Sequence, residues 1–127
     1  MSKGERLYYL ISSTTIALAV AIGAFGAHAL KKIVTVDKLA VFETGVRYQM
    51  YVGLGLFGLA LFKSIHKDIK LSYSFWSIFT GMIIFSGLLY LYVITGIKVF
   101  AMFVPIGGLL MILGWLGVGF KTFWKTK

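Results

Sequence analysis

Long uncharged stretches alternate with short charged ones along the chain. Residues 7–30, 71–97 and 99–120 are uncharged runs of 24, 27 and 22 residues. An α-helix of roughly 20 apolar residues crosses a hydrocarbon core about 30 Å thick, so each run is long enough to span a bilayer. The pattern therefore predicts three transmembrane helices.

A fourth span is predicted between residues 39 and 62. Its uncharged part, residues 48–62, has only 15 residues. The helix becomes long enough if it begins near Leu39 and carries Glu43 and Arg47 in its first turns. These two charges are four residues apart and can pair on one face, which lowers the cost of placing them near the bilayer. We expect spans at about residues 7–30, 39–62, 72–96 and 100–121.

These spans predict an all-α integral membrane protein with one domain over residues 1–127. The connections at 63–70 and around Lys98 are short, so the helices form an up-down antiparallel four-helix bundle. Thr35 or Asp37 can cap the second helix. Pro105 has two interpretations. Either the last helix begins there, with residues 99–104 along the interface or folded back, or it kinks there.

Composition and charge agree with a membrane location. At 59% hydrophobic and 13% charged residues, the chain is far more apolar than a soluble domain. Four spans place eight of the 13 Lys and Arg residues on the side of both termini. The positive-inside rule then puts both termini in the cytoplasm. Such flanking lysines contact anionic lipid, and nucleic acid is not an expected partner.

Helical spacing predicts which residues meet between helices. In lipid, small residues favour association because they let two backbones approach closely. One stripe on the first helix is Thr14, Ala17, Ala21, Ala24 and His28, and its counterpart on the second is Thr44, Tyr48, Tyr51, Gly55 and Gly58. The positions expected in helix packing are Gly23, Ala24, Gly26, Ala27, Gly55, Gly58, Gly87, Gly107, Gly108 and Gly114.

Five polar residues fall near the predicted outer end of the first two helices: His28, Glu43, Arg47, Tyr48 and Gln49. In one interpretation they form a hydrogen-bonded clasp that fixes the first hairpin, because polar groups at membrane depth seek one another. In the other they form a small outward-facing site for a lipid headgroup, a quinone-like ligand or an ion. Arg47 would then recognise an anionic or carbonyl oxygen, and His28 would donate or titrate.

Other apparent motifs do not support catalysis. Residues 53–58 match G-x-G-x-x-G, but they lie inside an apolar helix with no strand before them, so helix packing is expected. His28 and His66 fall on opposite sides of the membrane, which opposes paired haem ligation. The sequence has no cysteine, and it offers no metal set and no catalytic dyad. We therefore expect no enzyme, no metal and no cofactor.

Several short motifs, in order along nearly the whole chain, resemble one family. They are GAFGAH at 23–28, Thr44-Gly45 with Tyr48-Gln49, Phe85-Ser86-Gly87 with Leu89-Tyr90, and Pro105-Ile106-Gly107-Gly108 with Gly114-Trp115. Together they resemble the bacterial membrane family called domain of unknown function 423, to which the eukaryotic small transmembrane protein 256 is similar. The resemblance implies a small multi-span protein of the bacterial inner (plasma) membrane without an assigned activity. Its characteristic positions here would be Gly23, Gly26, His28, Tyr48, Gln49, Gly87, Tyr90, Pro105, Gly107, Gly108, Gly114 and Trp115.

The chain also departs from the family pattern. Relatives often carry a histidine shortly after the Tyr-Gln pair, whereas position 52 is Val52 here. Leu88 and Val104 stand where serine and threonine would fit. These differences argue against a two-histidine metal or cofactor site in this chain.

Two functions follow from the sequence. The first is a binding or transport element that uses the five-residue polar cluster, expected as a homo-oligomer because four short helices hardly enclose a pore alone. The second is a structural or assembly subunit whose glycine-rich helix faces pack against another membrane protein. Membrane lipids are partners in both cases.

Overall fold

The computed structural model describes residues 1–125, which form helices joined by short connections. The elements are α1 (Lys3–His28), the 3₁₀ turn η1 (Leu30–Lys32), α2 (Val36–Ile65), α3 (Ser72–Thr95), α4 (Lys98–Met102) and α5 (Val104–Phe123). No strand occurs within these described residues. The all-α class predicted from the sequence is confirmed.

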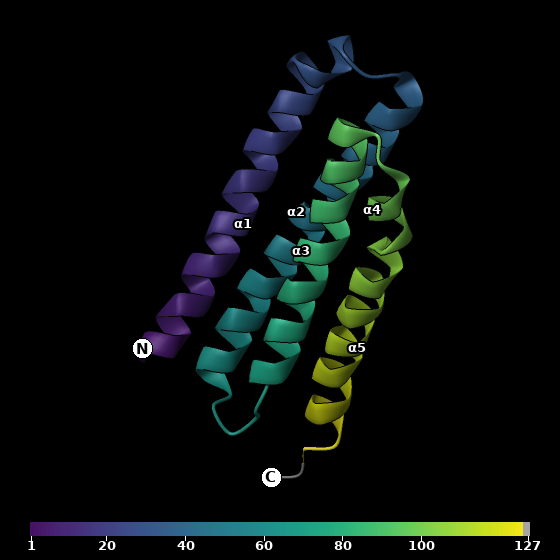
Figure 1. Cartoon of the computed structure of the whole chain (residues 1–127). Coiled ribbons are helices and arrows are strands. Elements are labelled where there is room, and N and C mark those ends of the chain that lie inside the picture. Colours follow the sequence, from purple (N-terminus) through teal and green to yellow (C-terminus); the bar gives the residue numbers. More distant parts are fainter. Residues whose placement is uncertain (126–127) are drawn as a thin grey trace.

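The four long helices lie side by side, and successive ones run in opposite directions (Figure 1). α2 and α3 take the middle places, since α1 packs along α2, α2 along α3, and α5 along α3. Over their described lengths, α1 and α5 do not pack against each other. The N-terminus, the α2–α3 connection and the end of α5 lie at the same end of the molecule.

Three segments are long and apolar enough to cross a membrane: α1 with η1, α3, and α4 with α5. Their apolar side chains are largely exposed on the outside of the protein, as Leu18, Ile83 and Ile112 illustrate. In water so much exposed apolar surface would be unfavourable, whereas lipid tails solvate it. The structure therefore agrees with a multi-pass membrane protein.

Local chemistry fixes where the helices begin and end. Ser2 Oγ accepts from the Glu5 backbone N–H while Glu5 Oε1 accepts from Ser2 N–H, a capping box that starts α1. Thr35 Oγ1 accepts from Lys38 N–H at 3.3 Å, so the predicted cap is confirmed and α2 begins at Val36. Gly96 ends α3 with φ of 73°, a left-handed conformation that disfavours other residues.

Pro105 lies in the first turn of α5, whose short predecessor α4 carries residues 98–102. The first of the two interpretations of this proline is thus the one observed. Proline suits the first turn because its missing N–H would have no partner inside the helix. The final span accordingly consists of two helices with a break at Phe103.

Two apolar clusters form the interior. The larger consists of Val52, Leu56, Leu59, Leu71, Phe75, Ile78, Met82 and Met111. The smaller consists of Leu30, Phe42 and Val93, toward the other end of the helices. Along α2 and α3 the two clusters are separated by a polar band, formed by Gln49 of α2 and by Ser86 and Tyr90 of α3. This band contains the candidate functional site.

The buried face of α1 differs from the expected one. Its buried residues are Ser12, Thr15, Ala19 and Gly26, and the predicted stripe from Thr14 to His28 is exposed instead. On α2 the buried face includes Phe42, Gln49 and Leu56, next to the stripe predicted from Thr44. In a bilayer both faces of a helix are apolar, so hydrophobic periodicity does not reveal which face packs inside.

Candidate functional site

Gln49 is the centre of the polar band. Its side chain is only 5% exposed, and it bonds to both neighbouring helices. Gln49 Nε2 donates to the Thr15 carbonyl oxygen of α1 at 3.1 Å. Gln49 Oε1 accepts from the Tyr90 hydroxyl of α3 at 2.7 Å. A buried carboxamide without partners would be costly, so these bonds tie α1, α2 and α3 together.

Two glycines on α2 make room for this arrangement. Gly45 and Gly53 lie four residues before and after Gln49, and therefore on the same helix face. A Cβ added to Gly45 would lie 2.7 Å from the Tyr90 ring. A Cβ added to Gly53 would lie 2.9 Å from Ile16 Cγ1 and 3.3 Å from the Ile16 backbone nitrogen. The glycines thus allow Tyr90 and the α1 backbone to approach Gln49.

Ser86 extends the polar band along α3. Its hydroxyl donates to the Gly45 carbonyl oxygen of α2 at 2.7 Å, and the side chain is 1% exposed. Thr15 Oγ1 donates to the Ile11 carbonyl of its own helix at 2.8 Å. The band lies near the middle of α1, about 18 Å from either end at 1.5 Å per residue. Polar groups are thus concentrated at mid-depth in the apolar helices.

A groove of about 400 Å³ runs between α1 and α3, over the polar band. Leu18 and Ile22 of α1 and Phe79 and Ile83 of α3 contribute to its apolar walls. The residues at its base include Thr15, Gln49, Ser86 and Tyr90. The groove therefore combines an apolar surface with a few polar atoms, the usual composition of a small-molecule site.

Gly87 keeps part of the groove open. It lines the groove on α3, and a Cβ added there would meet no atom within 4 Å. Gly87 thus differs from Gly45 and Gly53, whose missing side chains are replaced by neighbouring protein atoms. A larger residue at position 87 would fill the groove without displacing the helix backbones.

The five residues expected as one polar cluster lie on different parts of the surface. Gln49 lies at the base of the groove. Tyr48 is 41% exposed, packs on Phe85 at a ring distance of 4.8 Å, and lines another cavity between α2 and α5. His28 is exposed at the last position of α1. Within residues 1–125, no hydrogen bond or ion pair joins any two of the five.

Glu43 and Arg47 border a small pocket of about 240 Å³ beside Gly23. The expected ion pair between them is not formed, because Arg47 Nη2 instead donates to Thr44 Oγ1 at 3.3 Å. Successive residues on a helix point about 100° apart, which separates Arg47, Tyr48 and Gln49 onto three directions. The predicted cluster did not take into account that these neighbouring side chains point in different directions.

The glycine and alanine positions named for helix packing differ in their surroundings. Added Cβ atoms at Gly26, Gly55, Gly107 and Gly114 would lie 2.5–2.7 Å from Phe42, Trp115, Gly81 and Ile78 atoms, respectively. At Gly23 the nearest atom is Val46 Cγ1 at 3.2 Å, and at Gly108 it is Phe85 Cδ2 at 3.8 Å. Ala24 and Ala27 are exposed. Gly58 and Gly87 face open space.

Sequence reasoning missed Thr15 and Tyr90 as partners of Gln49. It also missed Ser86, which bonds to the Gly45 carbonyl oxygen of the same band. The sequence did contain one indication of this site. A glycine lies four residues before Gln49 and another lies four residues after it, which indicates that the glutamine is on a closely packed helix face. Titratable groups are scarce in this region. Within residues 1–125, no group of three or more His, Cys, Asp and Glu side chains could hold a metal ion.

Comparison with known proteins identifies relatives but no activity. A family model described as "Protein of unknown function (DUF423)" matches residues 22–108. A UPF0382 membrane protein of Staphylococcus aureus (strain bovine RF122 / ET3-1) is 39% identical over 118 residues, covering 93% of this chain and 96% of the relative. The UPF0382 membrane protein YwdK of Bacillus subtilis is 35% identical over 112 residues, covering 87% of this chain and 91% of the relative. No solved structure matches the chain.

Proposed function

The chain belongs to the DUF423 family of proteins of unknown function, and we propose that it is a four-span cell-membrane protein that binds a small lipid-soluble molecule between α1 and α3. The observation that carries this proposal is the groove of about 400 Å³ over the Gln49 band. Its volume is within the range of small-molecule sites, roughly 300–1,000 Å³. The proposal replaces the expected outer cluster with a site at mid-depth.

The four-span arrangement is supported by the position of α2. This helix packs between α1 and α3, both of which are apolar enough to span a membrane. A helix held along two spans shares their depth, and α2 has 30 residues. Glu43 and Arg47 lie in the third and fourth turns of α2. Both are exposed, and long charged side chains at such positions extend toward the nearer helix end, where water is close.

Cysteine labelling tests both the span count and the orientation, because the chain has no cysteine of its own. Lys32→Cys and Lys67→Cys place single thiols at the two ends of α2. With both termini in the cytoplasm, an impermeant thiol reagent applied to intact cells labels Lys32→Cys and spares Lys67→Cys. Equal labelling of the two variants would contradict a spanning α2, and the reverse pattern would contradict the orientation.

The position of the groove defines the chemistry of its occupant. The walls belong to helices that face lipid, so the molecule must partition into the bilayer before it binds. A glutamine amide has two N–H groups, and only one of those of Gln49 is used in the bond to Thr15. The Tyr90 and Ser86 hydroxyls donate to protein oxygens and retain acceptor lone pairs. An apolar body with one hydroxyl or carbonyl oxygen matches these groups.

We propose binding without a chemical step. Among the described residues that line the groove there is no Asp, Glu, His, Lys or Cys. General acid–base or nucleophilic catalysis depends on such side chains, or on hydroxyls activated by them. The hydroxyls of Thr15, Ser86 and Tyr90 instead donate to carbonyl or carboxamide oxygens.

Glycine variants test the groove with a built-in control. Gly87→Leu fills the groove, whereas Gly58→Leu places the same side chain in open space on α2, away from the groove. The probe is a long-chain fatty alcohol with a photoreactive diazirine, used on the protein in membranes. We expect saturable labelling of α1 and α3 groove residues in the wild type and Gly58→Leu. Undiminished saturable labelling of Gly87→Leu would refute the groove as the binding site.

A second candidate is an assembly subunit, acting with another copy or with another membrane protein. Gly58 and Gly119 favour it, because both are exposed and an added Cβ would contact nothing within 4 Å. Such positions allow another helix to approach closely. Native mass spectrometry decides this alternative: a stoichiometric partner that is lost in Gly58→Leu but kept in Gly87→Leu would support assembly over ligand binding.

A further inference from the structure

A second pocket, of about 810 Å³, lies at the end of the molecule opposite η1. It is bordered by the start of α1, the α2–α3 connection and the end of α5, which lie at this end (Figure 1). Five lysines line it: Lys63, Lys67, Lys70, Lys121 and Lys125. Glu5 and Asp68 are the acidic residues of its described lining. The pocket thus concentrates positive charge where the apolar helices end.

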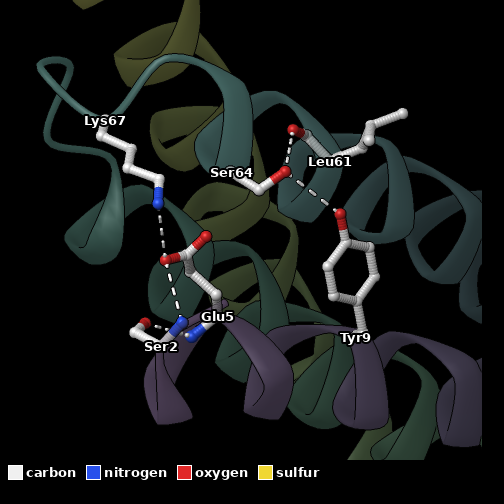
Figure 2. Close-up of polar contacts among 6 residues, drawn as sticks. All are labelled: Ser2, Glu5, Tyr9, Leu61, Ser64 and Lys67. Carbon is white, nitrogen blue, oxygen red and sulfur yellow. Dashed lines mark hydrogen bonds and ion pairs between the residues drawn. The ribbon is translucent and has the colours of Figure 1, made fainter.

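Ion pairs account for two of the five lysines. Lys67 Nζ lies 3.5 Å from Glu5 Oε1. Figure 2 shows Lys67 extending from the α2–α3 connection toward Glu5, which also accepts from the N–H of Ser2, the N-cap of α1. Lys125 Nζ lies 3.8 Å from Asp68 Oδ2. In the part of the chain that the structure describes, Lys63, Lys70 and Lys121 form no ion pair. The pocket therefore has an excess of cationic groups.

Two of these three lysines are held in place by uncharged oxygens or by an aromatic ring. Lys63 Nζ donates to Ser72 Oγ at 3.4 Å and lies 5.0 Å from the centre of the Tyr8 ring. Lys121 Nζ donates to the Lys70 carbonyl oxygen at 3.3 Å. Each ammonium group has three N–H donors, so both retain donors for a ligand. Contacts to neutral partners position the charge without neutralising it.

Ser72 adds a neutral donor between these groups. Its Oγ accepts from the Tyr8 hydroxyl at 3.1 Å as well as from Lys63. Its own hydroxyl hydrogen is not used in any bond among residues 1–125. Ammonium groups and a hydroxyl donor around one cavity are the groups that recognise phosphate oxygens.

We propose that this pocket binds a phosphate group, presented by an anionic phospholipid headgroup or by a soluble phosphate compound. Its place at the end of the apolar helices puts it at headgroup level, where a lipid phosphodiester can enter while its chains remain in the bilayer. The site differs in place and chemistry from the groove between α1 and α3, and it does not rest on that function.

Lipid titration of the full-length protein in detergent, followed by native mass spectrometry, tests the proposal. The probes are dioctanoyl phosphatidylglycerol and inorganic phosphate. Lys63→Gln with Lys121→Gln removes two unpaired charges from the pocket. Lys31→Gln with Lys32→Gln removes the same charge at the opposite end. We expect about 25-fold weaker phosphatidylglycerol binding for the pocket pair, about fivefold for each lysine, and less than twofold for the control pair.

The second probe, inorganic phosphate, distinguishes the two sources of the phosphate group. If millimolar inorganic phosphate displaces the lipid from the wild type, the pocket takes soluble phosphate; if it does not, the pocket requires the lipid headgroup. Equal weakening in the two pairs of variants would overturn the proposal, because it would reflect net charge alone. The absence of saturable binding of both probes to the wild type would also overturn it.

Discussion

Removing the Tyr90 hydroxyl tests how much the polar band contributes to stability, because the change deletes a single oxygen atom. Tyr90→Phe deletes the 2.7 Å bond to Gln49 Oε1 and keeps the ring that packs on Phe42. Interhelical hydrogen bonds in membrane proteins contribute about 0.6 kcal/mol on average and at most about 1.7 kcal/mol. We expect a loss of about 1 kcal/mol in the free energy of unfolding, because the partner oxygen belongs to a side chain that is only 5% exposed.

A double-mutant cycle separates this bond from other effects. Gln49→Leu removes the carboxamide at similar volume, and Tyr90→Phe should then cost almost nothing in its background. The assay is reversible unfolding in mixed micelles, followed by circular dichroism. Tyr51→Phe is the control, since Tyr51 is 60% exposed on α2. Additive losses, or an equal loss in Tyr51→Phe, would refute the argument that Gln49 and Tyr90 join α2 to α3.

Three further changes test the helix contacts and the helix ends, each by the same unfolding assay. Gly107→Ala would put a Cβ 2.5 Å from the Gly81 carbonyl oxygen and should cost about 1–3 kcal/mol, whereas Gly119→Ala should cost less than about 0.5 kcal/mol. Gly96→Ala forces an alanine to φ of 73° and should cost about 1 kcal/mol; no loss would contradict the left-handed cap. Ser2→Ala removes the capping box and should cost about 0.5–2 kcal/mol, with faster amide exchange confined to the first turn of α1.

The sequence was sufficient to predict the four long helices, but not the short helix α4. Uncharged runs mark them because a bilayer excludes charge over about 20 residues. The cap of α2 was predicted as either Thr35 or Asp37, because an oxygen of either side chain can accept from the first free N–H groups of a helix; Thr35 is the residue that does so. For Pro105 the sequence left two interpretations, a helix that begins at the proline or a helix that kinks there, because proline is compatible with both.

The polar contacts were less predictable, since they depend on which face of each helix is buried. Soluble helices show this face as an apolar stripe, but lipid-facing residues are apolar too. Gln49 was predicted to belong to a polar cluster with His28 of the first helix and with Glu43, Arg47 and Tyr48 of its own helix, none of which bonds to it. Thr15 and Tyr90 are 34 and 41 residues away along the chain. Their pairing depends on helix rotation, which the sequence pattern does not specify.

Native mass spectrometry of protein released from its own membranes tests the central claim, that the groove between α1 and α3 binds a lipid-soluble molecule. We predict that the wild type and Gly58→Leu carry the same small apolar molecule with one oxygen-bearing group. Gly87→Leu should fold with the same helix content and lack it, because leucine fills space that is open in the wild type. Retention of that molecule by folded Gly87→Leu would contradict the account.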